Sequence, residues 1–208
     1  MQTLLQRKTD LSVIVPVYNL ERFLKPLLKS LKEQKTEYTV QNIFVLNNCT
    51  DNSKSVILES CLPCVILSCE EQGCGPTRNK GLEKASGEYV WFMDGDDWLT
   101  CDTAIQDAMD LAKGKDIVRI PFQSIGFRRN WFSMVWQYVM RKDLIGDTRF
   151  PSIQPCEDDA FMEVILKKAG LDRYRHMELP SLDHALYEYN YLREGSNMFR
   201  YLIEREKI

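Results

Sequence analysis

The chain has 208 residues, of which 44% are hydrophobic and 27% are charged, which is the composition of an ordinary globular protein. Its formal net charge of −3 excludes a global basic field for nucleic acid or an anionic membrane. The N-terminus has no apolar signal-peptide core, and no stretch approaches the ~18 apolar residues of a membrane-spanning helix. We therefore expect a cytoplasmic protein with a single domain over residues 1–208.

Strands and helices are predicted to alternate through the first hundred residues. Runs of β-branched and apolar residues indicate strands, whereas helical spacing and polar capping residues indicate helices. The predicted elements are a strand over 11–17, a helix over 20–32, a strand over 40–46, a helix over 51–59, a strand over 65–68, a helix after the turn at 73–77 and a strand over 89–93. This alternation is typical of right-handed βαβ units around a parallel sheet.

The pattern is less regular after residue 100. The elements predicted there are a helix over 103–111, strands over 117–121 and 134–139, a short helix near 142–144, a helix that ends at Lys168, a strand over 182–189, a loop over 192–198 and a short tail helix. The predicted fold class is α/β, with a Rossmann-like, mostly parallel central sheet flanked by helices and a short mixed C-terminal region. Neither G-x-G-x-x-G after the first strand nor G-x4-G-K-[ST] occurs, which argues against a dinucleotide enzyme and a P-loop NTPase.

An acidic segment follows the predicted strand over 89–93. Asp94, Asp96 and Asp97 lie just beyond the carboxyl end of that strand, where open α/β sheets bind their ligands. Acids this close together repel one another unless a positive charge joins them. A hard divalent cation with oxygen ligands, carrying a bound diphosphate, would join them. The alternative interpretation is a solvated acidic turn.

Seven cysteines occur in a chain that shows no secretory signal, which favours reduced thiols. The spacing of Cys61 and Cys64 could begin a zinc site that also includes Cys69 and Cys74. A strand between Cys64 and Cys69 would, however, hold these two at opposite ends, too far apart for one tetrahedral metal. Buried free thiols are the favoured interpretation.

Several motifs occur in one order along the chain. They are Val13-Ile14-Val15-Pro16-Val17-Tyr18-Asn19, Asn48-Cys49-Thr50-Asp51-Asn52-Ser53, Gly75-Pro76-Thr77-Arg78-Asn79-Lys80-Gly81, Ala85-Ser86-Gly87-Glu88-Tyr89, Asp94-Gly95-Asp96-Asp97 and Glu157-Asp158. Together they resemble the family 2 glycosyltransferases of the GT-A fold, tightly over about residues 10–100 and more loosely from Phe150 to Met198. The resemblance implies a nucleotide-binding half over about 10–100 and an acceptor-side half over about 101–208.

The resemblance also implies an activity. Such enzymes transfer a sugar, with inversion, from a nucleotide diphosphate donor to an acceptor hydroxyl. A UDP-sugar is the leading donor, and a glycan or cell-surface polymer is the leading acceptor. The residues implied to bind the nucleotide sugar are Pro16, Tyr18, Asn19, Asn47, Arg78, Asp94, Gly95, Asp96, Asp97, Arg193 and Ser196.

Four acids carry the roles closest to the chemistry. The resemblance implies that Asp96 holds Mn²⁺ or Mg²⁺ at the diphosphate, that Asp94 contacts the ribose and that Asp97 shapes the acceptor side. It implies that Asp158 is the base that deprotonates the acceptor hydroxyl. These roles fit the chemistry, because a diphosphate leaving group needs a cation and a sugar hydroxyl needs a base. The alternative for Glu157-Asp158-Asp159 is a helix cap.

The nucleoside pocket is implied to form from residues at two strand ends. Pro16, Tyr18 and Asn19 would line the base pocket, Asn47 would face the pyrimidine, and Arg78 would lie near the base and diphosphate. The position of Asn47 is usually acidic in the family. An amide can accept from uracil N3–H and donate to O4, but it could also suit another base.

Other positions leave open questions. Cys49 stands where the family commonly has glycine, so a backbone angle open to glycine is expected to be lost. Arg193 and Ser196 resemble a closing loop that covers the diphosphate. His176 and His184 could each complete a metal shell, although a structural role is favoured for both.

Three other functions are alternatives to this one. The basic and aromatic segment Arg128-Arg129-Asn130-Trp131-Phe132 could touch a nucleic acid that carries a hydroxylated base, but an amphipathic core segment is favoured. A non-catalytic protein that binds sugar nucleotides is disfavoured by the intact Asp94, Asp96 and Asp158. A nucleotidyltransferase is disfavoured because no glycine-rich basic loop follows the first strand.

Overall fold

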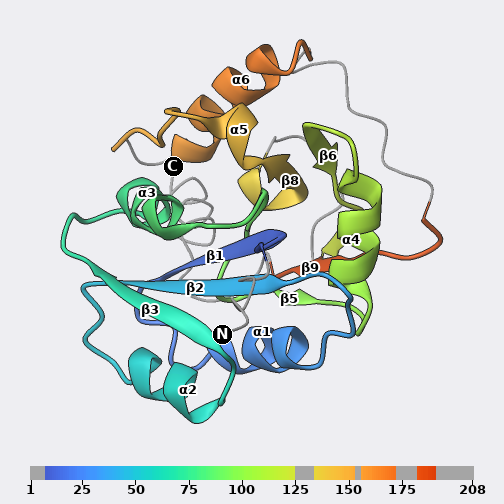
Figure 1. Cartoon of the computed structure of the whole chain (residues 1–208). Coiled ribbons are helices and arrows are strands. Elements are labelled where there is room, and N and C mark those ends of the chain that lie inside the picture. Colours follow the sequence, from blue (N-terminus) through green and yellow to red (C-terminus); the bar gives the residue numbers. More distant parts are fainter. Residues whose placement is uncertain (1–7, 125–133, 153–155, 172–181, 191–208) are drawn as a thin grey trace, which may run out of the picture.

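A six-stranded sheet forms the centre of the computed structural model, which describes residues 8–124, 134–152, 156–171 and 182–190 (Figure 1). Its strands, in sheet order, are β3 (Cys64–Cys69), β2 (Val40–Asn47), β1 (Leu11–Val17), β4 (Tyr89–Phe92), β8 (Tyr138–Arg141) and β6 (Ile117–Arg119). The first four are parallel, β8 is antiparallel to β4, and β6 is antiparallel to β8. The predicted α/β class with a mostly parallel central sheet is confirmed.

The central strand β1 is buried along its whole length. Helices cover both faces of a parallel sheet, so a central strand needs apolar residues at successive positions rather than at alternate ones. Ile14 pairs with Ile43 on β2 and with Phe92 on β4, which fixes the register of the three strands. Their carboxyl ends therefore lie at the same edge of the sheet.

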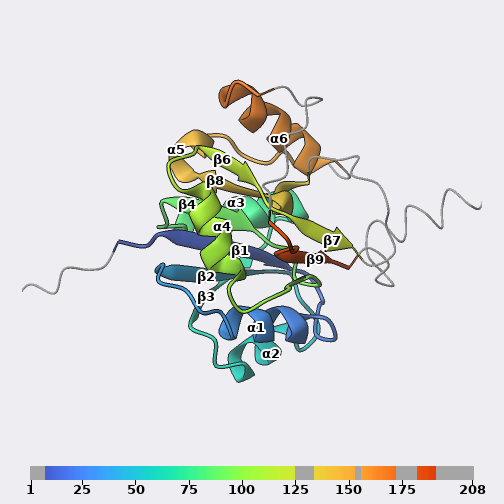
Figure 2. The ribbon, with the colours of Figure 1, turned by 90° about the vertical axis from the view of Figure 1, so that its right-hand side faces the viewer.

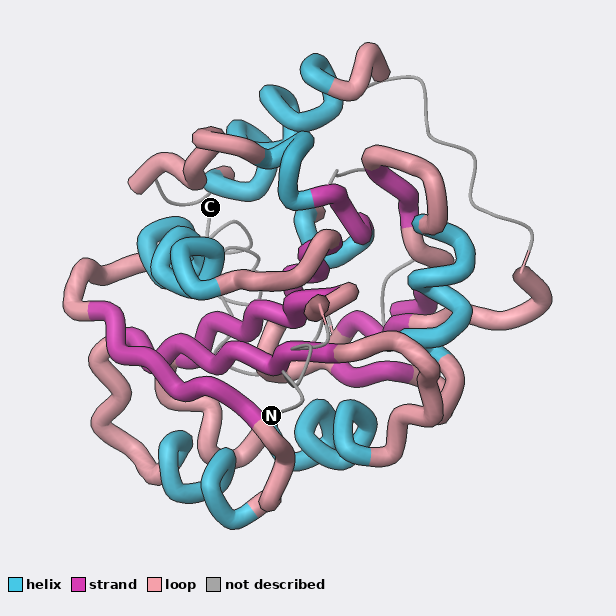
Figure 3. Tube along the Cα trace, in the orientation of Figure 1, coloured by secondary structure: helices cyan, strands magenta, loops and turns pink. Residues whose placement is uncertain are grey.

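Helices form a layer on each face of this sheet (Figures 2 and 3). The helices α1 (Leu24–Lys32), α2 (Ser53–Glu59) and α4 (Ala104–Ala112) pack in one apolar core, and α3 (Cys74–Lys84), α5 (Lys142–Ile145) and α6 (Glu157–Lys168) pack in the other. Gly81 brings α3 close to the sheet, because a Cβ there would lie 2.4 Å from Cγ2 of Ile14. The site therefore lies where α3 and α6 approach the ends of β1 and β4.

A second sheet ties the C-terminal part of the described chain to the acidic segment. It consists of β5 (Trp98–Leu99), β9 (Tyr187–Tyr189) and β7 (Phe122–Ser124), in that order. β9 is antiparallel to β5 and parallel to β7. Tyr187 and Tyr189 both stack on Trp136, with ring centroids 5.0 and 4.8 Å away. This packing places β9 beside the turn that follows β4.

Several predicted elements need correction. The strand predicted over 134–139 is wrong in its first part, because Val135–Gln137 form the 3-10 helix η1 and only then does β8 begin. The strand predicted over 182–189 contains only β9, and the short strands β5 and β7 were not predicted. The first predicted helix begins at Leu24 rather than Leu20. The loop over 192–198 and the tail helix lie outside the described residues.

All seven cysteines are free, and β3 separates Cys64 from Cys69 at its two ends, as expected. The expectation that the clustered thiols are buried holds for Cys69 but is wrong for Cys61, which is exposed. Among the helices of the described ranges, none is long and apolar enough to cross a membrane.

Candidate active site

Two loops at the carboxyl ends of β1 and β2 are joined by hydrogen bonds. The side-chain oxygen of Asn19 accepts a bond of 2.8 Å from the backbone N–H of Thr50, and Asp51 accepts one of 2.9 Å from the backbone N–H of Glu21. Pro16 is buried beneath these loops, whereas Tyr18 is 50% exposed. A rigid floor with an exposed aromatic ring is suited to a planar ligand such as a nucleobase.

The residues of these loops adopt backbone angles that suit them. Asn19 and Asn48 both have a φ of 49°, and asparagine tolerates this left-handed region better than most residues. Cys49 does not adopt a positive φ. The glycine-type angle is therefore absent at Cys49, as expected, and the turn has a positive φ at Asn48 instead.

Asn47 is buried at the end of β2, and its amide is engaged with the backbone. Its nitrogen donates to the carbonyls of Cys69 and Glu71 at 3.0 and 2.8 Å, and its oxygen accepts from the N–H of Gly73 at 3.1 Å. Both amide hydrogens are thus used. The donation to uracil O4 predicted for Asn47 would require one of these bonds to break. In this structure Asn47 orders the glycine turn that begins α3.

Arg78 on α3 is the centre of a buried group of charges. Its guanidinium, only 3% exposed, donates to Asp94 at 2.9 Å, to Glu157 at 3.3 Å and to Asp158. Although burial opposes ionisation, the neighbouring carboxylates raise the pKa of Arg78, so the guanidinium remains charged. The resemblance implies that Arg78 lies near the base and diphosphate. In the structure, Arg78 joins the end of β4 to α6.

The segment before α6 holds that helix against α3. Asn79 forms two hydrogen bonds of 2.9 Å with the backbone of Phe150. The ring of Phe150 stacks on Phe161 of α6, with centroids 3.9 Å apart, and lies beneath the guanidinium of Arg78 at 5.4 Å. These contacts bring the first turn of α6 to the edge of the sheet.

Asp158 lies in that first turn and is 7% exposed. Burial raises the pKa of Asp158 to about 7; Arg78 opposes this rise, and the negative charges of Asp94 and Glu157 add to it. Its second oxygen accepts from the backbone N–H of Val135 at 3.4 Å. A carboxyl group with a pKa near neutrality can accept a proton at physiological pH and release it again.

The three acids after β4 have different surroundings. Asp94 is bonded to Arg78, Asp96 is partly buried, and Asp97 is fully buried. Gly95 lets this turn lie against the start of α1 and the segment before it, since a Cβ there would be 2.6 Å from Cδ1 of Leu20 and 3.4 Å from Cδ2 of Leu24. Asp94 and Asp97 are thus each held by a neighbouring protein group, and a cation shared by the three acids stays a prediction.

Asp97 connects the acidic turn to β9. Its carboxylate accepts from the hydroxyl of Tyr187 at 2.6 Å and from the backbone N–H of Asn190 at 2.8 Å. The Tyr187 oxygen in turn accepts from the backbone N–H of Asp94 at 3.1 Å. Burial raises the pKa of Asp97 well above its ordinary range, with Asp96 and Asp94 adding to the rise. Asp97 thus joins the acidic turn to β9 and the residue that follows it, and its role on the acceptor side stays a prediction.

The chemistry of the acidic turn fits a hard divalent cation. Asp94 is bonded to Arg78 and Asp97 is fully buried, whereas the Asp96 carboxylate is partly buried at the same turn. Carboxylate oxygens are the ligands that Mg²⁺ and Mn²⁺ prefer. Such an ion, which takes most of its other ligands from water and phosphate, needs no cage of protein acids.

The remaining predicted residues lie elsewhere. His184 lies 3.5 Å from Asp107 of α4, at the end of β9 opposite to the one that contacts Asp97. It is therefore not part of the acidic turn. Arg193, Ser196, His176 and the segment 128–132 lie outside the described residues. Glu157 and Tyr187 were not predicted as site residues, because their contacts with the site come only from the tertiary fold.

An exposed aromatic ring, an acidic turn and a buried carboxyl group at one edge of a mostly parallel sheet are the features expected of GT-A sugar-nucleotide enzymes. A model of Glycosyl transferase family 2 matches residues 12–165. The chain belongs to this family.

Named relatives and solved structures agree with that assignment. The poly(ribitol-phosphate) β-N-acetylglucosaminyltransferase TarS of Staphylococcus aureus is 35% identical over 102 residues, 47% of this chain and 18% of TarS. The minor teichoic acid biosynthesis protein GgaB of Bacillus subtilis is 33% identical over 120 residues, 54% of this chain and 13% of GgaB. The chain thus spans less than a fifth of the length of either relative.

The fold itself is that of solved family members. The structure of TarS 1–349 in complex with UDP-GlcNAc has a TM-score of 0.76 at 24% identity, over 92% of this chain and 61% of that one. The mannosyltransferase PcManGT of Pyrobaculum calidifontis, in complex with GDP-Man and Mn²⁺, has a TM-score of 0.72 at 18% identity, over 96% and 61%. At these identities the likeness establishes the fold.

Proposed function

We propose that this chain transfers a sugar from a nucleotide diphosphate donor to an acceptor hydroxyl, with inversion at the anomeric carbon. The observation that carries this proposal is the position of Asp158, a buried acid with a pKa of about 7 that shares Arg78 with Asp94 at the ligand-binding edge of the sheet. A helix cap alone would have no need of a buried carboxylate tied to the end of a central strand.

The reaction follows from the properties of this acid. Asp158 takes the proton of the acceptor hydroxyl while the hydroxyl oxygen forms a bond to the anomeric carbon. The bond from that carbon to the diphosphate breaks, and its electron pair leaves with the diphosphate. A divalent cation held by Asp96 would supply charge neutralisation for the leaving group. Arg78 keeps Asp158 and Asp94 in fixed positions during the transfer.

A UDP-sugar is the leading donor. Tyr18 offers an exposed ring for a base at the end of β1, and Asn47 keeps one acceptor lone pair on its oxygen for an N–H such as N3–H of uracil. TarS, one of the structural neighbours, binds UDP-GlcNAc, whereas PcManGT binds GDP-Man. Binding of GDP must therefore be measured beside binding of UDP.

A hydroxyl-rich cell-surface polymer is the leading acceptor. TarS acts on poly(ribitol-phosphate), and GgaB takes part in minor teichoic acid biosynthesis, as their names state. Transfer to a hydroxylated base in nucleic acid is the second candidate, and the segment 128–132 that suggested it lies outside the described residues. A steep salt dependence of DNA binding would favour the second candidate over the first.

Calorimetry with UDP and GDP, each with and without Mn²⁺, tests the donor site. We expect UDP to bind the parent protein in a Mn²⁺-dependent manner and Asp96→Ala to bind it at least tenfold more weakly. Asp116→Ala is the matched control, because Asp116 is an exposed acid with only a distant ion pair, at 3.9 Å to Arg141. Equal UDP affinity in Asp96→Ala and the parent would overturn the metal assignment.

A further inference from the structure

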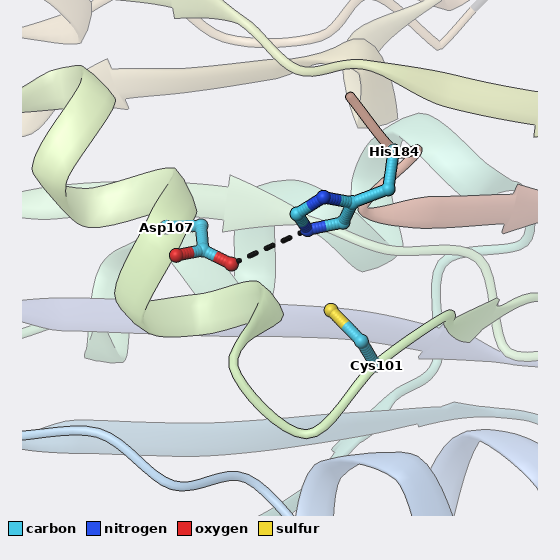
Figure 4. Close-up of side chains that lie close together, drawn as sticks. All are labelled: Cys101, Asp107 and His184. Carbon is cyan, nitrogen blue, oxygen red and sulfur yellow. Dashed lines mark ion pairs between the residues drawn. The ribbon is translucent and has the colours of Figure 1, made fainter. Parts of the chain in front are cut away.

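Cys101, which follows β5, Asp107 of α4 and His184, which precedes β9, lie close together (Figure 4). One ligand atom from each of these residues lies within 4.8 Å of the other two. The imidazole Nε2 of His184 is 3.5 Å from a carboxylate oxygen of Asp107. The thiol of Cys101 points toward the imidazole from the loop that follows β5. Thus three kinds of metal ligand converge from three separate segments.

These separations are close to those of a tetrahedral metal centre. With typical bond lengths from zinc to sulfur, nitrogen and oxygen, neighbouring ligand atoms in a tetrahedron are about 3.4–3.6 Å apart. The pair formed by His184 and Asp107 already has this separation. His184 is 49% exposed in its side chain, so rotation of the imidazole can shorten the remaining distances without disturbing the core.

The loop that carries Cys101 is held in place by groups that do not bind the metal. The amide nitrogen of Gln34 donates to the carbonyl of Cys101 at 2.7 Å, and its oxygen accepts from the N–H of Ile105 at 2.9 Å. Thr103 donates to Asp107 at 2.8 Å, which orients the carboxylate. Such outer contacts are typical of sites whose ligands must be positioned before the ion arrives.

The type of ligand determines the type of ion. A thiolate together with an imidazole disfavours Mg²⁺, Ca²⁺ and Mn²⁺, which prefer oxygen, and favours Zn²⁺ and similar borderline ions. Three protein ligands leave a fourth position for water. The carboxylate of Asp96 favours the ions that prefer oxygen, so the two sites would not compete for the same ion.

We propose that Cys101, Asp107 and His184 bind one Zn²⁺ ion as a structural site separate from the sugar-nucleotide site. The ion would fasten α4 and the loop after β5 to the segment that leads into β9. His184 is three residues before Tyr187, and Thr100 donates to the carbonyl of Leu186 at 3.2 Å within this segment. Metal binding there would stabilise the strand that holds Asp97.

Zinc and cobalt titrations of the metal-free Asp96→Ala protein test this proposal. Asp96→Ala removes the other candidate ligand, so one equivalent of Zn²⁺ is expected to bind in competition with a chromophoric chelator. Co²⁺ at the same site should give the near-ultraviolet charge-transfer absorption of a cobalt–thiolate bond. Adding Cys101→Ser should abolish this absorption, and adding His184→Gln should weaken Zn²⁺ binding at least tenfold.

Two matched controls exclude binding elsewhere. Cys156→Ser removes an exposed thiol outside the cluster, and Asp110→Asn removes an exposed acid from the same helix as Asp107. Both variants should leave the titrations unchanged. Zn²⁺ should also raise the melting temperature of the Asp96→Ala protein but not that of its His184→Gln derivative. Equal zinc affinity with and without Cys101→Ser and His184→Gln would overturn the proposal, as would the absence of any zinc binding.

Discussion

The parallel half of the molecule, residues 8–99, and the C-terminal half, the described residues after 99, contribute to the site in different ways. In the parallel half, the strand-end residues are held by their neighbours, as Asn19 is by Thr50 and Asn47 is by the turn at Gly73. In the C-terminal half, links reach the site from α6, as Asp158 binds Arg78, and from β9, as Tyr187 binds Asp97. The strand-end loops of the parallel half thus hold one another, whereas the part of the site formed with the C-terminal half depends on a few buried polar contacts.

Arg78→Met should break this arrangement most severely. It removes the common partner of Asp94, Glu157 and Asp158, and breaking a buried ion pair leaves uncompensated charges. We expect a loss of about 3–5 kcal/mol in the free energy of unfolding, measured by urea denaturation at pH 8. Lys80→Met on the same helix removes only a half-exposed pair with Glu83 and should change stability by about 0.5 kcal/mol or less. Similar losses in the two variants would contradict the role of Arg78.

Tyr187→Phe tests the second link. It keeps the ring stacked on Trp136 but removes the hydroxyl that donates to the buried Asp97, and we expect a cost of about 1–3 kcal/mol in thermal or urea unfolding. Tyr38→Phe is the matched control, because the Tyr38 hydroxyl donates at 2.7 Å to Asp110, which is exposed and can bind water instead. If Tyr187→Phe cost no more than Tyr38→Phe, β9 would not depend on Asp97.

Glu157→Gln should change the pKa of Asp158 rather than the fold. The negative charge of Glu157 adds to the raised pKa of Asp158, so its removal should lower that pKa below about 7. In the proposed mechanism the deprotonated form of Asp158 is the active base. The transfer rate of the parent protein should therefore rise as the pH increases through about 7, and the transfer rate of Glu157→Gln should rise at a lower pH. Carboxyl ¹³C NMR titration measures the shift directly, with Glu59→Gln on α2 as control. An unchanged or higher pKa would contradict this prediction.

Cys156→Gly should have the smallest effect of these variants, and it should stabilise the protein rather than destabilise it. Cys156 precedes α6 with a φ of 103°, a region that glycine adopts without the steric cost that a Cβ imposes. We expect the glycine variant to be more stable by about 0.5–1 kcal/mol in urea denaturation. Cys156→Ser keeps the Cβ and should show no gain. A gain in the serine variant would mean that the thiol, not the backbone angle, causes the strain.

The parallel half could largely be predicted because its signals are local. Runs such as Leu11–Val17 are long, β-branched and buried on both faces, so pattern and structure agree. The strand predicted over 134–139 is wrong in its first part because two hydrogen bonds overrode β propensity. One is the local turn bond from Gln137 to Met134, and the other is the tertiary bond from Val135 to Asp158. The partners of Arg78, which lie 16, 79 and 80 residues away, could not be read from spacing. The family resemblance predicts the role of Asp158, but it does not predict that Asp158 shares Arg78 with other carboxylates.

Asp158→Asn tests the central claim most directly, because asparagine keeps the size of the side chain and an oxygen that can accept from Arg78, but it cannot take up the proton. UDP and Mn²⁺ should bind the variant within about twofold of the parent by calorimetry, while single-turnover transfer from the best donor falls by about 10²–10⁴-fold. Transfer at the parental rate would show that Asp158 is not the base and would contradict the proposed mechanism.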